Sequence, residues 1–260
     1  MMPRFEYRRA ASADEAVTLW AEQPGARYLA GGTDLLPQLR AGHRTLSRAV
    51  DIKRVPELAQ IVAGDDGSLS VGAAASLTDI AAHPAIQRRY PIVAECCLAV
   101  GAHALRNRAT MAGNICNASP AADTAVALLA VEAAVELLGP AGRRSVPISD
   151  WFTGPGATAM EPGELVTRIV LPARPAGWRG RYYRLSRRKG MDLATVGVLV
   201  ARAAGAGEPE HRVVLAAVAP TPLRVRGAEQ ILDRDGCGDP AACRAAELAC
   251  EQCNPITDVR

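Results

Sequence analysis

Aromatic residues are scarce in this chain: they make up 4% of its 260 residues, and only two of them are phenylalanines. No apolar run is as long as the roughly 18 residues that a transmembrane helix requires, so we expect no membrane span. The formal net charge is only +3, and the basic residues form no nucleic-acid-binding motif, which argues against nucleic acid as a partner. The hydrophobic fraction of 49% is typical of globular proteins, with a core of small aliphatic side chains that suits close packing of helices on a sheet.

A secretory signal is also missing, because residues 1–6 contain no apolar segment. The seven cysteines are an odd number in a chain without such a signal, which predicts a cytoplasmic protein without disulfides. Four cysteines near the end of the chain suggest a metal site at first, namely Cys237, Cys243, Cys250 and Cys253. Their spacing matches no zinc or ferredoxin pattern, and Cys243 and Cys250 are predicted to be small buried residues of an alanine-rich helix. We therefore expect no metal ligands.

A pair of glycines, Gly31 and Gly32, follows a short apolar run near the start of the chain. Two missing β-carbons let backbone N–H groups approach a bound anion closely. Thr33 adds a hydroxyl and Asp34 a carboxylate, a combination that fits a dinucleotide pyrophosphate with a polar group beside it. The pattern is not the Rossmann fingerprint, and Pro37 argues against a long helix. Alone, the segment fits a simple tight turn equally well.

Residues 109–123 form a second polar segment. Gly113 permits a positive φ or a close backbone approach, Asn114 tolerates left-handed geometry, and Thr110 adds a hydroxyl. We predict a long polar loop that leads into a buried helix, with Ser119 as its N-cap. The alternative is a capping loop whose polar side chains satisfy one another. Together with the glycine pair, the segment favours an extended ligand with a phosphate-containing centre.

The order of predicted elements divides the chain into three parts. Residues 1–55 should form a small α/β lobe that contains a helix capped at Ser12, residues 56–173 a second lobe, and residues 178–260 a lobe of strands followed by helices. Strands are predicted over residues 27–30, 49–52, 60–62, 69–72, 135–138, 165–171, 181–185, 195–202 and 212–218. Further helices are predicted over residues 92–100, 226–232 and 241–250.

Three motifs, residues 30–34, 110–114 and 117–123, resemble those of the flavoprotein subunit of the molybdenum hydroxylases. This family includes xanthine dehydrogenases, carbon monoxide dehydrogenases and 4-hydroxybenzoyl-CoA reductases. The similarity continues, in the same order, through residues 150–156, 163–166, 188–196 and 218–224. It covers nearly the whole chain and is strongest to the separate FAD-binding (medium) subunit of bacterial xanthine dehydrogenase-like enzymes.

The resemblance implies an α+β fold, with a two-lobed FAD-binding domain of the vanillyl-alcohol-oxidase type followed by a small α+β C-terminal lobe. It implies that the FAD pyrophosphate is wrapped by Leu29, Ala30, Gly31, Gly32, Thr33 and Asp34. A second set of contacts would come from Thr110, Met111, Ala112, Gly113 and Asn114. Asp123 would bond a polar part of FAD, Leu165 would lie near the adenine, and Tyr183 would border the flavin. Arg184 and Lys189 are nearby cations that rank below Tyr183.

The chain departs from the family pattern in three places. Ala112 replaces a common glycine, and we expect the local geometry to be kept because alanine tolerates most conformations except a positive φ. The cysteine-bearing insertion of some 4-hydroxybenzoyl-CoA reductases is missing after Asn114, so their extra iron–sulfur cluster should be absent. The family usually continues beyond the equivalent of residues 255–260, so we expect a C-terminal lobe that is incomplete or completed by a partner.

The implied function is electron transfer. Electrons from a molybdopterin large subunit would pass through two [2Fe–2S] clusters of a small subunit to FAD on this chain, and then to NAD⁺ or another acceptor. The cofactor does the redox chemistry, so no side chain is expected to be catalytic. Two alternatives remain: a self-standing FAD oxidoreductase with its own substrate pocket, and a non-enzymatic scaffold that has lost FAD. The intact Gly31, Gly32 and Asn114 argue against the second alternative.

Overall fold

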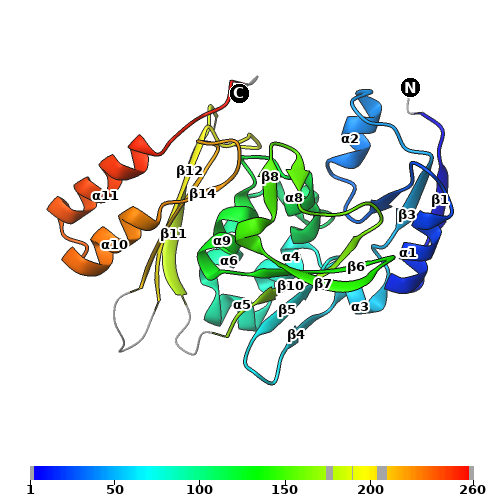
Figure 1. The fold of residues 1–260 in the computed structure, drawn as a ribbon, viewed down its shortest axis with the longest axis horizontal. Helices are drawn as coiled ribbons and strands as arrows, with labels where there is room; N and C mark the ends of the chain where they lie inside the picture. The colour runs from blue at the N-terminus through cyan, green and yellow to red at the C-terminus, as the bar shows by residue number, and fades with distance from the viewer. Residues whose placement is uncertain (1–2, 174–177, 189, 204–209, 258–260) are drawn as a thin grey trace.

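The computed structural model describes residues 3–173, 178–188, 190–203 and 210–257, which form three larger sheets and one two-stranded sheet with helices around and between them (Figure 1). The mixed helix and strand content matches the predicted α+β class. The N-terminal sheet and the C-terminal sheet lie at opposite ends of the molecule, with the central sheet between them. The boundary predicted near residues 172–177 falls mostly outside the described residues.

The N-terminal sheet is parallel, with strand order β1 (Glu6–Arg9), β3 (Arg48–Asp51) and β2 (Arg27–Leu29). Helix α1 (Ala13–Ala21) begins at the predicted cap, where the hydroxyl of Ser12 accepts a hydrogen bond from the Glu15 backbone N–H. The glycine pair directly follows β2 and leads into α2 (Leu35–Arg40), which is short, as Pro37 predicted. The pair therefore lies at the end of a parallel strand, a usual position for ligands.

The central sheet is antiparallel and has the strand order β4-β5-β10-β6-β7. Its strands are β4 (Ile61–Ala63), β5 (Leu69–Gly72), β10 (Leu165–Leu171), β6 (Ala134–Gly139) and β7 (Gly142–Pro147). Helices α6 (Pro91–Ala99) and α9 (Asp123–Val131) form a layer between this sheet and the C-terminal one. All nine residues of α9 are buried, as its uniformly apolar sequence predicted.

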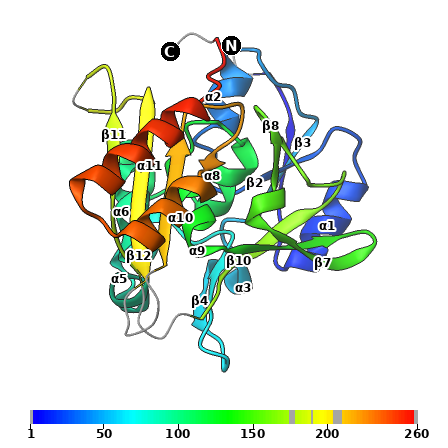
Figure 2. The ribbon, with the colours of Figure 1, turned by 60° about the vertical axis from the view of Figure 1, so that its left-hand side comes forward.

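The C-terminal sheet is antiparallel with order β11-β12-β13-β14. Its strands are β11 (Trp178–Leu185), β12 (Val196–Ala203), β13 (His211–Ala216) and β14 (Leu223–Arg224). Figure 2 shows α10 (Arg226–Asp235) and α11 (Asp239–Glu251) on its outer face, while α6 and α9 cover the inner face. One core joins the central sheet, this helix layer and the C-terminal sheet, with Ile169, Leu128 and Leu199 as members.

Shorter elements connect these layers. They are α3 (Pro56–Ala59), α4 (Leu77–Ala82), α5 (Pro84–Arg89), α7 (His103–Arg106), α8 (Met111–Asn117), the 3₁₀ turn Ile148–Asp150, β8 (Phe152–Gly154) and β9 (Ala157–Thr158). Within the part of the chain that the structure describes, no helix has the length and apolar character needed to cross a membrane.

Two predictions for residues 109–123 were wrong. Residues 111–117 form α8 rather than a loop, because Thr110 caps the helix and Met111 and Ile115 bury its apolar side. The next helix begins at Asp123, not at Ser119, because Ala118 adopts a left-handed conformation and residues 118–122 form a turn. The Ser119 hydroxyl accepts a bond from the Ala121 N–H within that turn.

Candidate functional site

A cleft of about 1200 Å³ opens between the N-terminal sheet and the α8 side of the central lobe. Its walls come from residues 25–35, from parts of residues 109–123, from residues 160–166 before and along β10, and from Arg188 and residues 191–193 of the C-terminal lobe. Ligand pockets are usually about 300–1,000 Å³, so this cleft suits an extended ligand larger than most single metabolites. It brings together the two segments that the sequence singled out.

The first wall depends on the two glycines. A β-carbon at Gly31 would lie 2.4 Å from the carbonyl oxygen of Arg108, so only glycine allows the two backbones to approach this closely. Gly32 has a φ of +74°, a left-handed conformation in which a residue with a β-carbon would be strained. The glycine pair therefore allows the chain to turn after β2 and to pack closely against the backbone of the second lobe.

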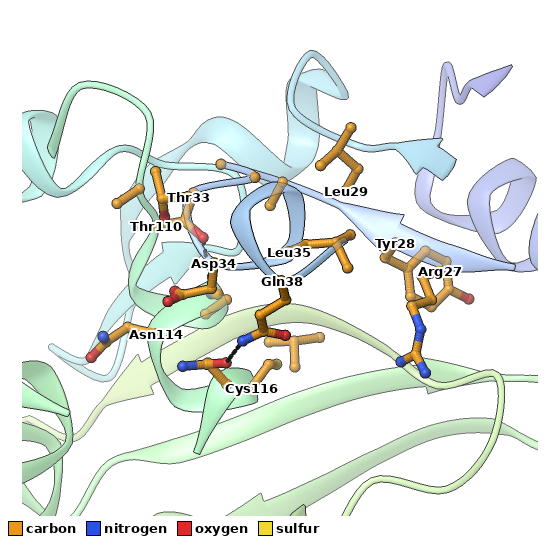
Figure 3. Close-up of a pocket in the computed structure, with 18 of the residues that line it drawn as sticks. Arg27, Tyr28, Leu29, Thr33, Asp34, Leu35, Gln38, Thr110, Asn114 and Cys116 are labelled. Atoms are coloured by element: carbon orange, nitrogen blue, oxygen red, sulfur yellow. Dashed lines mark hydrogen bonds between the residues drawn. The ribbon is translucent and has the colours of Figure 1, made fainter. Parts of the chain in front are cut away.

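Thr33 and Asp34 follow in the same wall, and Figure 3 shows both beside Thr110 and Asn114 of the facing segment. Asp34 occupies the N-cap position of α2, yet its side chain makes no capping bond and extends into the cleft. The carboxylate is reached by solvent through the open cleft, while burial by the surrounding protein atoms raises its pKa. It can therefore accept a hydrogen bond from a ligand hydroxyl.

The second wall is α8. The Thr110 hydroxyl accepts a 2.9 Å bond from the Gly113 N–H, and Asn114 Oδ1 accepts bonds from the hydroxyl and N–H of Thr124 in α9. Both side chains thus hold helix starts in place, as the capping alternative proposed, while both residues also line the cleft. Gly113 lies within the helix and does not use a positive φ, and a β-carbon there would meet only the Thr110 hydroxyl oxygen, at 3.0 Å, so neither predicted reason for a glycine is seen. Ala112 is helical and 5% exposed, so the alanine at this position causes no strain, as expected.

A hydrogen bond across the cleft joins the two lobes. Gln38 of α2 donates from Nε2 to Asn117 Oδ1 at the end of α8, over 3.0 Å (Figure 3). A second contact between the lobes is the 2.8 Å bond from the Tyr28 hydroxyl to the carbonyl oxygen of Gly163. Neither contact was predicted from the sequence, because partners this far apart in the chain have no local pattern.

Asp123 lies at the start of α9 and lines the cleft with 7% of its surface exposed. Its carboxylate accepts a 2.8 Å bond from the Tyr182 hydroxyl and pairs with Arg184 at 3.2 Å. Burial raises the pKa of Asp123, and these two partners oppose that rise. Asp123 therefore connects the cleft wall to β11, in addition to any contact with a ligand.

Leu165 is 2% exposed and lines the cleft at the start of β10. The neighbouring Glu164 accepts a 2.7 Å bond from Arg144 Nη2 and a 2.6 Å bond from the Glu161 N–H. The Arg144 hydrogen bond holds the pKa of Glu164 below its usual value, although partial burial opposes this. The network fixes the loop that forms the outer end of the cleft.

Two predicted residues are not brought to the cleft. Met111 is 2% exposed and packs into the core from α8. Tyr183 is 67% exposed on β11 and is absent from the described lining, because alternate side chains of a strand point to opposite faces. The nearby lining comes instead from Arg188, Met191, Asp192 and Leu193. Lys189 lies outside the described residues.

The cysteines differ in part from expectation. Cys96 and Cys97 are buried in α6, and burial raises the pKa of both thiols, so they are unreactive core residues. Cys243 and Cys250 do lie on a helix, α11, but they are exposed, so the prediction that they are buried was wrong. The described residues contain no cluster of three or more side chains that could hold a metal ion.

Comparison with known proteins identifies both parts of the chain. Residues 3–174 match the family described as the FAD binding domain in molybdopterin dehydrogenase, and residues 181–260 match the CO dehydrogenase flavoprotein C-terminal domain. A putative xanthine dehydrogenase FAD-binding subunit of Escherichia coli is 36% identical over 226 residues, which cover 86% of this chain and 77% of the relative. The carbon monoxide dehydrogenase medium chain of Hydrogenophaga pseudoflava is 36% identical over 261 residues, which cover 99% of this chain and 90% of the relative.

Solved structures agree with this result. A carbon monoxide dehydrogenase chain from Hydrogenophaga pseudoflava superposes with a TM-score of 0.93 at 35% identity, covering all of this chain and 90% of its own. A quinoline 2-oxidoreductase chain from Pseudomonas putida gives 0.91 at 30% identity, again covering all of this chain and 90% of its own. The chain therefore belongs to the family of FAD-binding subunits of multi-subunit molybdenum hydroxylases.

Proposed function

We propose that this chain is an electron-transfer subunit that passes electrons from the [2Fe–2S] clusters of a partner subunit through bound FAD to NAD⁺ or another acceptor. The observation that carries the proposal is the cleft between the two lobes, closed by the contact of Gly31 with Arg108. Its lining contains nearly all the residues that the family resemblance assigns to FAD.

The residues of the cleft fit FAD in size and in chemistry. The volume of about 1200 Å³ accommodates a dinucleotide, and the absence of β-carbons at Gly31 and Gly32 leaves backbone N–H groups accessible to a pyrophosphate. We propose that residues 29–34 hold the pyrophosphate and that Thr110, Ala112, Gly113 and Asn114 line its other side. Asp123 would bond a polar part of the cofactor, and Leu165 would pack near the adenine. Met111 and Tyr183 would not contact the cofactor and would affect its binding only by supporting neighbouring residues.

The proposal divides the cofactor site between residues 1–55 and 56–173, with residues 178–260 as an attached lobe. When bound, FAD supplies an isoalloxazine that exchanges electrons singly or in pairs. The side chains of this protein bind and orient: Gln38 with Asn117 and Tyr28 with Gly163 hold the two lobes together around the ligand. We assign no acid, base or nucleophile of this chain to the electron-transfer reaction.

We further propose that the chain works in a heteromer in the cytoplasm, with an iron–sulfur small subunit and a molybdopterin large subunit. The names of the relatives support this, since they are medium chains or FAD-binding subunits of larger enzymes. The substrate would be selected on the large subunit, so residues of this chain do not define it.

The visible spectrum of the purified chain tests the proposal. We expect flavin bands without iron–sulfur absorption, and a colourless but folded protein would contradict FAD binding. Co-expression with the iron–sulfur small subunit and the molybdopterin large subunit should yield a complex that contains iron and molybdenum. Isolation of the flavin-loaded chain alone under those conditions would favour the self-standing oxidoreductase. Anaerobic addition of NADH should bleach the flavin bands, and unchanged bands would contradict NAD⁺ as the acceptor.

A further inference from the structure

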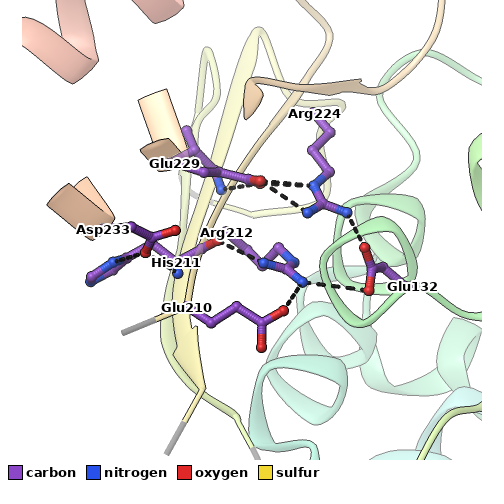
Figure 4. Close-up of polar contacts among 8 residues, drawn as sticks. Glu132, Glu210, His211, Arg212, Arg224, Glu229 and Asp233 are labelled. Carbon is purple, nitrogen blue, oxygen red and sulfur yellow. Dashed lines mark hydrogen bonds and ion pairs between the residues drawn. The ribbon is translucent and has the colours of Figure 1, made fainter. Parts of the chain in front are cut away.

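Three side chains of the C-terminal lobe form a hydrogen-bonded chain that the proposed electron transfer does not use. They are Asp233 of α10, His211 at the start of β13, and Cys237 in the turn between α10 and α11. None of the three lines the cofactor cleft. Figure 4 shows His211 and Asp233 on the side of β13 that faces away from Arg212 and Glu132.

The hydrogen bonds fix the tautomer of His211. Asp233 Oδ1 accepts a 2.8 Å bond from the His211 backbone N–H and lies 2.7 Å from its Nδ1. An ionised carboxylate only accepts hydrogen bonds, so Nδ1 carries a proton. The other ring nitrogen, Nε2, is therefore the acceptor in the neutral ring, and it lies 3.0 Å from the Cys237 sulfur.

This geometry positions His211 to take the proton of the Cys237 thiol. The carboxylate of Asp233 both orients the ring and stabilises the imidazolium that forms, which is the arrangement of an activated cysteine nucleophile. His211 is only 3% exposed and is held by backbone and side-chain bonds, whereas Cys237 is exposed. The base is thus shielded while the sulfur is open to a reagent in solution.

The charges beside the cluster do not compete for its hydrogen bonds. Asp235, two residues before Cys237, is paired with Arg234 at 2.7 Å and with Arg244 at 2.6 Å. The carboxylate that faces the imidazole is therefore that of Asp233. Cys243 and Cys250 are also exposed, on α11, and they provide a comparison within the same molecule.

We propose that Cys237 is an activated thiol that undergoes exchange with low-molecular-weight disulfides. The Cys237 proton moves to His211 Nε2, and the thiolate attacks one sulfur of the disulfide. A new bond forms between Cys237 and that sulfur as the original S–S bond breaks, and the leaving thiolate takes the proton from His211. The Cys237 sulfur is oxidised to the mixed disulfide, and the other sulfur of the small disulfide is reduced to a free thiol. Attack by a second small thiol on the mixed disulfide reverses the reaction.

Incubation of the full chain with oxidised glutathione at pH 7 tests the proposal, with peptide mapping by mass spectrometry. We expect the mixed disulfide to form at Cys237 at least ten times faster than at Cys243 or Cys250, and dithiothreitol to remove it. Similar rates at the three positions would overturn the proposal. The comparison within one molecule controls for protein concentration and for partial unfolding.

Variants of the two supporting residues separate activation from simple exposure. His211→Asn should lower the rate at Cys237 to that of Cys243, which should itself stay unchanged. Because His211 is buried, Asp233→Asn provides a second test at a partly exposed side chain: it should lower the rate of mixed-disulfide formation at Cys237 severalfold. Asp233→Glu should recover part of that loss, because it restores the carboxylate. If the ratio of the reaction rates at Cys237 and Cys243 stayed unchanged in both His211→Asn and Asp233→Asn, the role of the imidazole would be overturned.

Discussion

The backbone of Gly31 lies so close to Arg108 that a β-carbon at position 31 would be 2.4 Å from the Arg108 carbonyl oxygen. The contact joins the strand-end turn of the first lobe to the segment just before α8. The segment that contains Arg108 is held in place, because Leu77 donates a backbone hydrogen bond to the carbonyl of the adjacent Ala109. The shape of the cleft therefore depends on the lack of a side chain at one position.

Gly31→Ala should separate the two walls and greatly weaken FAD binding. Forcing a methyl group into such a contact costs about 1–3 kcal/mol or more, which corresponds to a loss of affinity of about fivefold or greater. The measurement is the FAD released per chain after denaturation, together with the dissociation constant from fluorescence titration. The matched control is Gly154→Ala, where the nearest atom would be 4.0 Å away, and it should keep its FAD. Equal FAD content in both variants would contradict the close-approach argument.

The bond between Gln38 and Asn117 should contribute to cofactor retention. Gln38→Leu removes the donor while keeping much of the side-chain volume, and a hydrogen bond of this kind is worth about 0.5–1.5 kcal/mol. We expect FAD to dissociate roughly two- to tenfold more readily. A double-mutant cycle with Asn117→Leu should show coupling between the two positions, whereas additive effects would mean that the bond does not form in solution.

Local signals predicted much of the fold. The Ser12 cap, the span of β10 and the strands β4 and β5 follow from short-range patterns of capping, alternation and turn residues. Local signals wrongly predicted a loop in place of α8, because Gly113 and Asn114 are poor helix formers. Burial of Met111 and Ile115 decided the outcome, and burial depends on the rest of the fold.

Residues that line the cleft were predicted where they are adjacent in sequence, whereas contacts between residues distant in sequence were missed. Gln38 and Asn117 are 79 positions apart, and His211 and Cys237 are 26 positions apart, so neither pair has a local motif. Tyr183 shows the sensitivity of strands to register: one position earlier, Tyr182 points inward and bonds Asp123.

The two neighbouring tyrosines should respond differently to the loss of a hydroxyl. Tyr182→Phe removes the bond to the buried Asp123 carboxylate and should lower the free energy of unfolding by about 1 kcal/mol. Tyr183→Phe alters an exposed side chain and should change it by less than about 0.5 kcal/mol. Urea unfolding measures both values. FAD content should also be normal in Tyr183→Phe and Tyr183→Ala; a loss of FAD there would return Tyr183 to the cofactor site.

Glu164 should make the stability of the outer end of the cleft depend on pH. Its pKa is lower in the folded protein, chiefly through the Arg144 hydrogen bond, so the folded state favours the ionised form. The resulting stabilisation is present above the unfolded pKa, near 4.5, and is lost as the pH falls through the folded pKa. Glu164→Gln should therefore lower the free energy of unfolding at pH 7 by about 1 kcal/mol, below the roughly 1.5–3 kcal/mol typical of hydrogen bonds to charged groups, because Arg144 is partly exposed.

The difference between wild type and Glu164→Gln should shrink below pH 4.5, in urea unfolding followed by circular dichroism at pH 3.5, 4.5 and 7. Glu136→Gln is the matched control on the same sheet, because Glu136 pairs with Arg168 at 3.0 Å with both side chains exposed. Such surface pairs contribute little, so this variant should stay within about 0.5 kcal/mol of wild type at every pH. A Glu164→Gln difference that stayed constant from pH 7 to pH 3.5 would mean that the carboxylate charge is not what stabilises this loop.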